Sequence, residues 1–221
     1  MNISPSATTI LCYGDSNTHG AKPDRKGRYT AEERWTGVMQ KQLGDSFYVI
    51  EEGLGGRTTD LPHHNPAKAN RNGLDYFKPC IDSHMPLDIV IIMLGTNDLK
   101  TIYDRSAEDV AEALKQYPEY IKNYCANSDA QLPRIILVSP PYMDDTASEF
   151  YSSMPTQGIY DEVSAQKSHD LAAAIEAVAK ETRCEFLDAG PITKTGQDGC
   201  HLDLDSHINL GKKLADIVAS I

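Results

Sequence analysis

One nearly continuous apolar run, Asp88-Ile89-Val90-Ile91-Ile92-Met93-Leu94, places the strongest constraint on the fold. A strand with one face in water alternates polar and apolar side chains, whereas a strand of a parallel sheet is covered on both faces and is apolar throughout. The run ends at Gly95, where a turn can begin. The sequence therefore predicts an α/β fold with this strand at the centre of a parallel sheet.

Further β-rich runs alternate with segments of helical periodicity along the chain. The β-rich runs cover residues 8–13, 47–51, 135–139 and 185–187, and the helical segments cover residues 32–43, 106–125, 161–182 and 206–221. The last helix has its apolar residues on one face and Asp205 or Ser206 available as N-cap. Such alternation is typical of a sheet with helices on both faces. We expect one domain over residues 1–221, built as a three-layer α/β/α sandwich.

The composition excludes several classes of function. No apolar run approaches the ~18 residues that span a bilayer, so we expect no membrane segment. The net charge of −11 opposes binding to phosphate backbones, which makes nucleic acid an unsuitable partner. Residues 1–6 lack the pattern of a secretory signal, which favours the cytoplasm. The five cysteines are odd in number and form no CxxC pair, which indicates reduced thiols.

Three short motifs each follow a predicted strand. They are Gly14-Asp15-Ser16, the glycine-rich segment 53–56 and the segment 95–98. In open α/β sheets, ligands bind outside the carboxyl ends of the strands. We therefore expect the three motifs to meet at one rim of the sheet.

The residue types in these motifs suit acyl-transfer chemistry. Ser16 becomes a nucleophile when a base accepts its proton, and His201, oriented by Asp198 three residues earlier, can act as that base. Attack on a carbonyl creates an oxyanion, which needs preorganised donors. The candidate donors are the N–H of Ser16, the N–H of Gly56 or Gly55, and the side-chain amide of Asn97.

These motifs resemble the GDSL, or SGNH, hydrolase family, and within it the bacterial arylesterase and acyltransferase branch. The similarity runs, in order, through residues 10–20, 33–38, 49–54 with 57–59, 87–100 and 138–141. The resemblance implies a five-stranded flavodoxin-like sheet, a Ser16, Asp198 and His201 triad, no cofactor, and assembly into a homo-oligomer. Asn17 departs from the family pattern, which has leucine at this position.

The resemblance implies a serine esterase that hydrolyses short-chain and aryl carboxylic esters through an acyl-enzyme, with transfer of the acyl group to alcohols as a further activity. Deacetylation of carbohydrates and hydrolysis of acyl thioesters are alternatives, because fold does not fix substrate. A flavodoxin-like binding module with an inactive site is the alternative outside the enzymes. The sequence has neither a GxSxG elbow nor a GxxxxGK[ST] loop, so an α/β-hydrolase fold and a phosphate loop are not supported.

Four further residues are candidates for the substrate pocket: Asn17, Trp35, Tyr142 and Met154. Asn17 adjoins the nucleophile, and Trp35 lies in a segment that the resemblance places near the acyl pocket or a subunit contact. The segment 142–160 is too apolar for a solvated loop, so we expect it to cover the cleft or a neighbouring subunit. Four histidines, His19, His63, His64 and His207, lack the spacing of a metal site, so we expect no bound metal.

Overall fold

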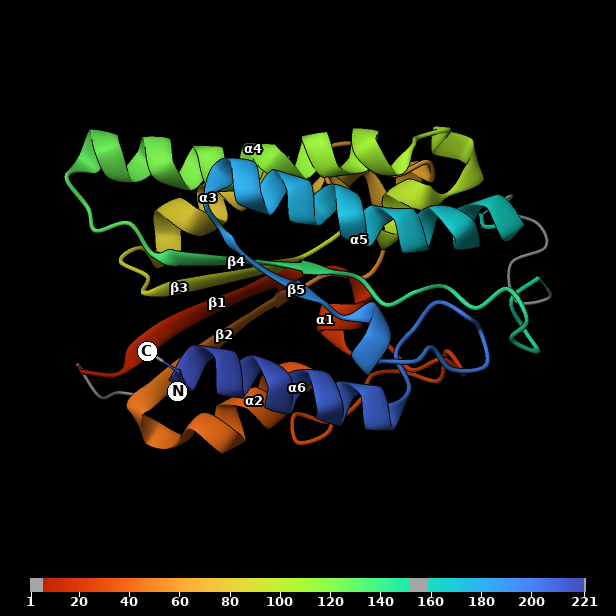
Figure 1. Ribbon diagram of the computed structural model, residues 1–221, viewed down its shortest axis with the longest axis horizontal. Helices are drawn as coiled ribbons and strands as arrows, with labels where there is room; N and C mark the ends of the chain where they lie inside the picture. The colour runs from red at the N-terminus through yellow and green to blue at the C-terminus, as the bar shows by residue number, and fades with distance from the viewer. Residues whose placement is uncertain (1–5, 152–158, 221) are drawn as a thin grey trace.

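Five parallel strands form a single sheet between two layers of helices (Figure 1). The computed structural model describes residues 6–151 and 159–220. The strands are β1 (Thr8–Gly14), β2 (Phe47–Gly53), β3 (Ile89–Met93), β4 (Arg134–Ser139) and β5 (Glu185–Asp188). Their order across the sheet is β2-β1-β3-β4-β5, which is the flavodoxin-like order. The predicted three-layer α/β/α fold is therefore confirmed.

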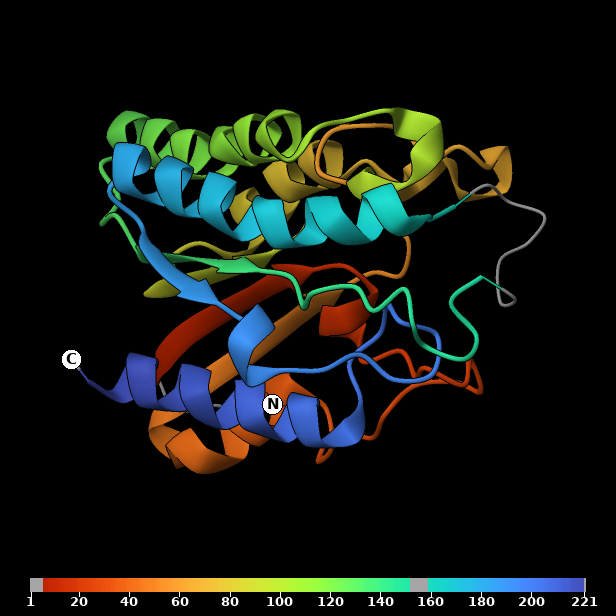
Figure 2. The same cartoon turned by 45° about the vertical axis from the view of Figure 1, so that its right-hand side comes forward.

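The helices divide between the two faces of the sheet (Figures 1 and 2). One face is covered by α3 (Gly73–His84), α4 (Ala107–Ser128) and α5 (Glu162–Thr182), and the other by α2 (Trp35–Leu43) and α6 (Leu204–Ala219). The short helix α1 (Ser16–His19) follows directly on β1. No helix in the described parts of the chain is long and apolar enough to cross a membrane.

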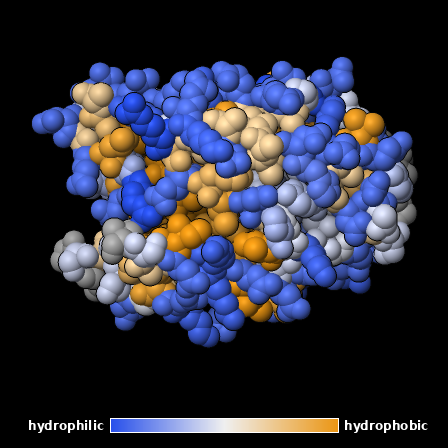
Figure 3. Space-filling model, viewed as in Figure 1, coloured by the Kyte–Doolittle hydropathy of each residue, from blue (hydrophilic) through white to orange (hydrophobic). Residues whose placement is uncertain are grey.

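Strand β3 is buried over its whole length, as its apolar run predicts. Val90 and Ile92 pack into the cluster beneath α3, α4 and α5, whereas Ile91 and Met93 pack into the cluster beneath α2 and α6. The alternate side chains therefore anchor both helical layers on one strand. In the space-filling view, hydrophilic residues cover most of the outline of the molecule, with apolar residues exposed nearer its centre (Figure 3).

Two helices differ from the sequence-based expectation. Helix α6 begins at Leu204, because the Asp203 carboxylate accepts the N–H of Ser206, so the expectation that Asp205 or Ser206 is the N-cap is wrong. Helix α3, which contains Pro79, was not expected. A proline removes the hydrogen bond to the carbonyl four residues earlier, here that of Asp75. Both residues are exposed, so water can solvate that carbonyl.

Candidate active site

Ser16 lies at the tight turn between β1 and α1. Gly14 makes this turn possible, because a Cβ atom there would lie 2.0 Å from the hydroxyl oxygen of Thr18. The Asp15 carboxylate caps α1 by accepting the N–H of Asn17 at 2.9 Å. Ser16 is thus the first residue of α1, where its backbone N–H has no partner within the helix. Its side chain lines a cleft at the carboxyl end of the sheet.

His201 and Asp198 form a close pair on the loop before α6. The Nδ1 atom of His201 lies 2.6 Å from Oδ2 of Asp198. The other carboxylate oxygen accepts the backbone N–H groups of Cys200 and His201 at 3.0 and 2.9 Å. Burial acts to raise the pKa of Asp198, but the hydrogen bonds and charge of His201 outweigh it and hold that pKa below its ordinary value. The carboxylate is therefore fixed in its charged form behind the imidazole.

The two candidate glycines form a turn that fixes the direction of one peptide group. Arg57 donates its N–H to the Leu54 carbonyl at 3.1 Å, and Gly56 has a φ of +81°, which favours glycine. The Arg71 Nε atom donates to the Gly55 carbonyl at 2.8 Å. Because the C=O and N–H of a trans peptide point in opposite directions, this bond directs the N–H of Gly56 away from Arg71.

Asn97 connects the three strand-end motifs. It follows β3 in a 3-10 turn, and its side-chain amide donates to the Arg57 carbonyl at 3.0 Å and to Asp15 at 3.4 Å. The buried Arg57 guanidinium donates in turn to the Gly14 carbonyl at 2.8 Å. These bonds hold the ends of neighbouring strands together, so the amide has a fixed place beside the nucleophile turn.

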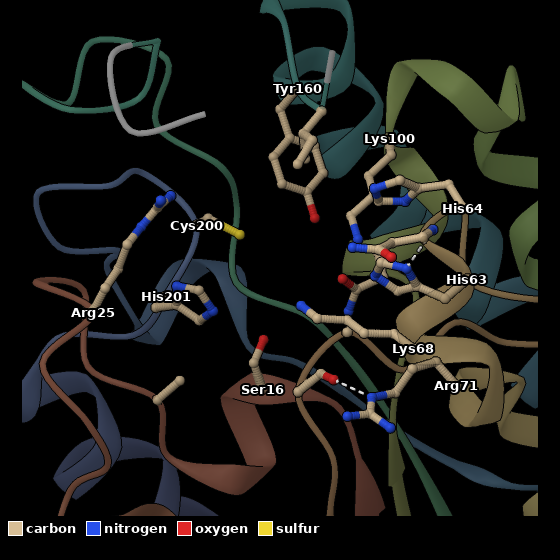
Figure 4. Close-up of a pocket in the computed structure, with 16 residues that line it drawn as sticks. Ser16, Arg25, His63, His64, Lys68, Arg71, Lys100, Tyr160, Cys200 and His201 are labelled. Atoms are coloured by element: carbon tan, nitrogen blue, oxygen red, sulfur yellow. Dashed lines mark hydrogen bonds between the residues drawn. The ribbon is translucent and has the colours of Figure 1, made fainter. Parts of the chain in front are cut away.

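These elements surround a cleft of about 430 Å³ (Figure 4). It contains five of the six residues that the sequence predicts for the triad and oxyanion hole: Ser16, Gly55, Gly56, Asn97 and His201. The sixth, Asp198, lies buried behind His201. In Figure 4 the His201 ring faces Ser16 across the cleft. The strand-end motifs therefore meet at one rim of the sheet, as expected.

Asn17 does not line this cleft. Its side chain is 1% exposed, and its oxygen accepts the N–H of Leu202 at 2.9 Å while its nitrogen donates to the Cys200 carbonyl at 3.3 Å. Asn17 therefore holds the two residues that flank His201. Its place in the molecule is between the nucleophile turn and the histidine loop, and not in a substrate pocket as the sequence suggested.

Trp35 and Tyr142 also lie outside the cleft, contrary to the pocket expectation. Trp35 is 1% exposed and packs among the apolar side chains between α2 and α6. Tyr142 donates its hydroxyl to Asp188 at 2.8 Å and packs its ring on His169. Trp35 is therefore part of the apolar core, and Tyr142 is held at the end of β5 by its bond to Asp188. The fourth candidate, Met154, lies outside the described residues.

The described parts of the apolar segment 142–160 lie in two different places. Met143 and Phe150 are buried in the core cluster beneath α3, α4 and α5. Ile159 and Tyr160 line the cleft, and the Tyr160 hydroxyl donates to the Thr96 carbonyl at 3.1 Å. The end of this segment therefore forms a wall of the cleft, which agrees with the expectation that the segment covers the cleft.

The histidines that raised the question of a metal have other contacts. His63 and His64 stack with ring centres 4.2 Å apart and line the cleft. His207 is buried and its Nδ1 accepts the backbone N–H of Trp35 at 3.3 Å. Among the described residues, the group with metal-ligand spacing is a different one, on β2 and α3. It consists of Glu52, Cys80 and His84.

Sequence reasoning missed four basic residues of the cleft: Arg25, Lys68, Arg71 and Lys100. Lys100 lies two residues after the segment 95–98 that follows β3, so the positional rule for strand ends could have found it. Lys68 and Arg71 lie in the stretch 61–72, which contains basic residues and no Asp or Glu. Charge patterning was the signal that could have identified this stretch.

Comparison with known proteins gives consistent matches over nearly the whole chain. A family model described as the GDSL-like Lipase/Acylhydrolase family matches residues 12–210. The inhibitor-bound aryl esterase of M. smegmatis is 36% identical, with a TM-score of 0.86 over 97% of this chain and 99% of that chain. Est24, a carbohydrate acetylesterase from Sinorhizobium meliloti, is 35% identical, with a TM-score of 0.84 over 96% and 99%. Among curated protein sequences, no significant match is found.

Proposed function

The chain belongs to the GDSL-like lipase/acylhydrolase family, and from this membership we propose that it is a serine esterase acting on short-chain and aryl carboxylic esters. The observation that carries the proposal is the 2.6 Å contact between the imidazole of His201 and the carboxylate of Asp198, together with the direction of that imidazole, which faces Ser16 (Figure 4). A buried carboxylate behind an imidazole, with a serine in front of it, is the arrangement that acyl transfer requires.

In the proposed reaction, the Ser16 oxygen attacks the ester carbonyl while His201 Nε2 takes its proton. The electron pair of the carbonyl moves onto oxygen, and Asp198 stabilises the imidazolium that forms. The intermediate collapses to the acyl-enzyme as His201 returns the proton to the departing alcohol. Water then attacks the acyl group by the same two steps, which releases the acid and restores the hydroxyl of Ser16. The scheme needs no cofactor.

Three donors are proposed to stabilise the oxyanion: the N–H of Ser16, the N–H of Gly56 and the side-chain amide of Asn97, which exchanges its 3.4 Å bond to Asp15 for one to the oxyanion. The hydrogen bond from Arg71 to the Gly55 carbonyl supports Gly56 over Gly55, because it fixes the orientation of the peptide between them. Loss of one such donor raises the barrier by about 2.7 to 4 kcal/mol.

Carbohydrate deacetylation is a second candidate, favoured by the similarity to a carbohydrate acetylesterase over 96% of the chain. A panel of aryl acetate, acetylated sugar and acyl thioester separates these activities by kcat/KM. Supplying vinyl acetate with benzyl alcohol in water tests acyl transfer, for which ester product is the expected sign. Homo-oligomer formation and a cytoplasmic location stay predictions.

The proposed function is tested by steady-state hydrolysis of 4-nitrophenyl acetate. We expect turnover by the native protein and a loss of several orders of magnitude in His201→Ala, because removal of one triad member disables the unit. Comparable turnover in the two proteins would refute the assignment. No turnover and no reaction with a fluorophosphonate would favour a binding module with an inactive site.

A further inference from the structure

The cleft has a charge opposite to that of the whole protein. The chain carries a net charge of −11, with 32 acidic and 21 basic residues. The sixteen described residues that line the cleft include no Asp or Glu, whereas Arg25, Lys68, Arg71 and Lys100 are among them. A cleft lined by one sign of charge raises the local concentration of ligands of the other sign. Such a segregation of charge favours a negatively charged ligand.

Lys100 is the most informative of these residues. It is 5% exposed, yet within the described parts of the chain its ammonium has neither a hydrogen bond nor an ion pair. Burial lowers the pKa of Lys100 to about 8. The charge of Lys68 adds to this shift, whereas Cys200, Asp98 and Asp15 act to raise the pKa. Burying a charge without a partner is costly, and a negatively charged ligand group in the cleft would offset that cost.

Two of the three remaining basic side chains lie around the same part of the cleft as Lys100, whereas Arg25 lies on the side of His201 (Figure 4). In Figure 4, Lys68, Arg71 and Lys100 lie together with His63 and His64 on one side of Ser16, and His201 lies on the other. Burial lowers the pKa of His63 to about 4, and the charge of Lys100 adds to this shift.

The position of His201 indicates which half of an ester meets these cations. His201 must face the departing oxygen in order to protonate it. The alcohol half of the ester therefore extends toward His201. Lys68 and Lys100 line the part of the cleft on the other side of Ser16, which is open to the acyl half. Ammonium groups bind carboxylates through short, charge-assisted hydrogen bonds.

We propose that the substrates of this site are esters whose acyl chain ends in a carboxylate, such as half-esters of short dicarboxylic acids, and that Lys100 and Lys68 bind this carboxylate. The inference rests on the proposed esterase function and specifies its substrate class.

The test compares kcat/KM for two matched pairs of esters. Monoethyl glutarate and ethyl pentanoate differ by a charge on the acyl half, whereas 4-acetoxybenzoate and phenyl acetate differ by a charge on the leaving group. We expect the native protein to prefer the charged member of the first pair. In Lys100→Met and in Lys68→Met, that preference should fall about ten- to hundredfold, the range for a hydrogen bond to a charged group.

Lys78→Met is the matched control, because it removes the same charge from an exposed position on α3 outside the cleft. Lys68 is exposed, so its variant tests the proposal even if Lys100→Met fails to fold. Added salt should reduce the native preference, since screening weakens ionic binding.

Equal kcat/KM for the two members of the first pair overturns the inference. A preference for monoethyl glutarate that survives both lysine substitutions also overturns it. So does a preference for the charged ester that appears only in the second pair, with 4-acetoxybenzoate. Hydrolysis of phenyl acetate that depends on Ser16 would in each case leave the proposed esterase function standing. Absence of hydrolysis of all four esters would instead contradict the proposed function.

Discussion

The side-chain oxygen of Asn17 accepts the backbone N–H of Leu202 at 2.9 Å, and this bond connects the nucleophile turn to the histidine loop across 185 residues of sequence. The nitrogen of the same amide donates to the Cys200 carbonyl at 3.3 Å. Asn17 thus holds both neighbours of His201. The position of the imidazole relative to Ser16 therefore depends on a residue that does not line the cleft.

Asn17→Leu should lower both stability and kcat. Leucine leaves the buried N–H of Leu202 and the carbonyl of Cys200 without their partner, which costs about 1 to 3 kcal/mol. Urea unfolding and steady-state kinetics measure the two effects. Asn123→Leu on the exposed face of α4 is the matched control. Native stability and native kcat in Asn17→Leu would show that the loop is held by other contacts.

Asp198→Asn should reduce kcat by a factor of about 10⁴, because the amide no longer fixes the imidazole in the tautomer that accepts a proton from serine. The loss should appear in kcat with an unchanged fold by circular dichroism. Asp205→Asn removes a charge from an exposed position nearby and serves as the control. A kcat within tenfold of the native value would remove Asp198 from the mechanism.

The same carboxylate predicts a pH dependence of stability. The pKa of Asp198 in the folded protein lies below its ordinary value of about 3.9, although burial acts to raise it. Its contribution is therefore complete above pH about 4 and is lost as the pH falls through the lower folded pKa. The free energy of unfolding, measured for the native protein and Asp198→Asn, should converge in acid. A difference that is constant with pH would contradict this.

Asn97→Ala should lower kcat by about 10²- to 10³-fold, because one oxyanion donor is lost. KM should change little, since the oxyanion exists only in the transition state and the intermediate. The lost bonds to the Arg57 carbonyl and to Asp15 also predict a lower melting temperature. A variant with native kcat and raised KM would assign Asn97 to ground-state binding instead.

The preference for monoethyl glutarate should decline between pH 7 and 9. The pKa of Lys100 is lowered to about 8, so the ammonium loses its charge in this range. Lys68 lowers this pKa, whereas Cys200, Asp98 and Asp15 act to raise it. Lys100→Arg keeps its charge at these pH values, so its preference should persist to pH 9. A native preference that is independent of pH would show that Lys100 does not bind the carboxylate.

The sequence predicted the layers of the fold and most of the residues that meet at the rim, because those features depend on local pattern. The apolar run of β3 has one stable environment, between two helical layers, and the motifs follow the strands directly. Helix α3 escaped prediction, and Pro79 within it is not by itself the reason, because α4 was predicted although it contains Pro118. Trp35 was expected near the pocket on the resemblance alone, and the structure places it in the core between α2 and α6.

The contacts between distant segments were beyond prediction from the sequence. Asn17 looked like a pocket residue because its partners, the backbone groups of Cys200 and Leu202, have no sequence signature. The basic lining of the cleft comes from several separate segments, and their positive charge is hidden in the composition by the net charge of −11.

The most direct test of the account is the site of covalent labelling by a fluorophosphonate, measured by mass spectrometry of the intact protein and of its peptides. The account predicts one adduct, on the Ser16 oxygen, that is absent in Ser16→Ala and slowed in His201→Ala, since the imidazole activates this hydroxyl. Undiminished labelling of Ser16→Ala, or a label on any other residue at the same rate, would contradict it.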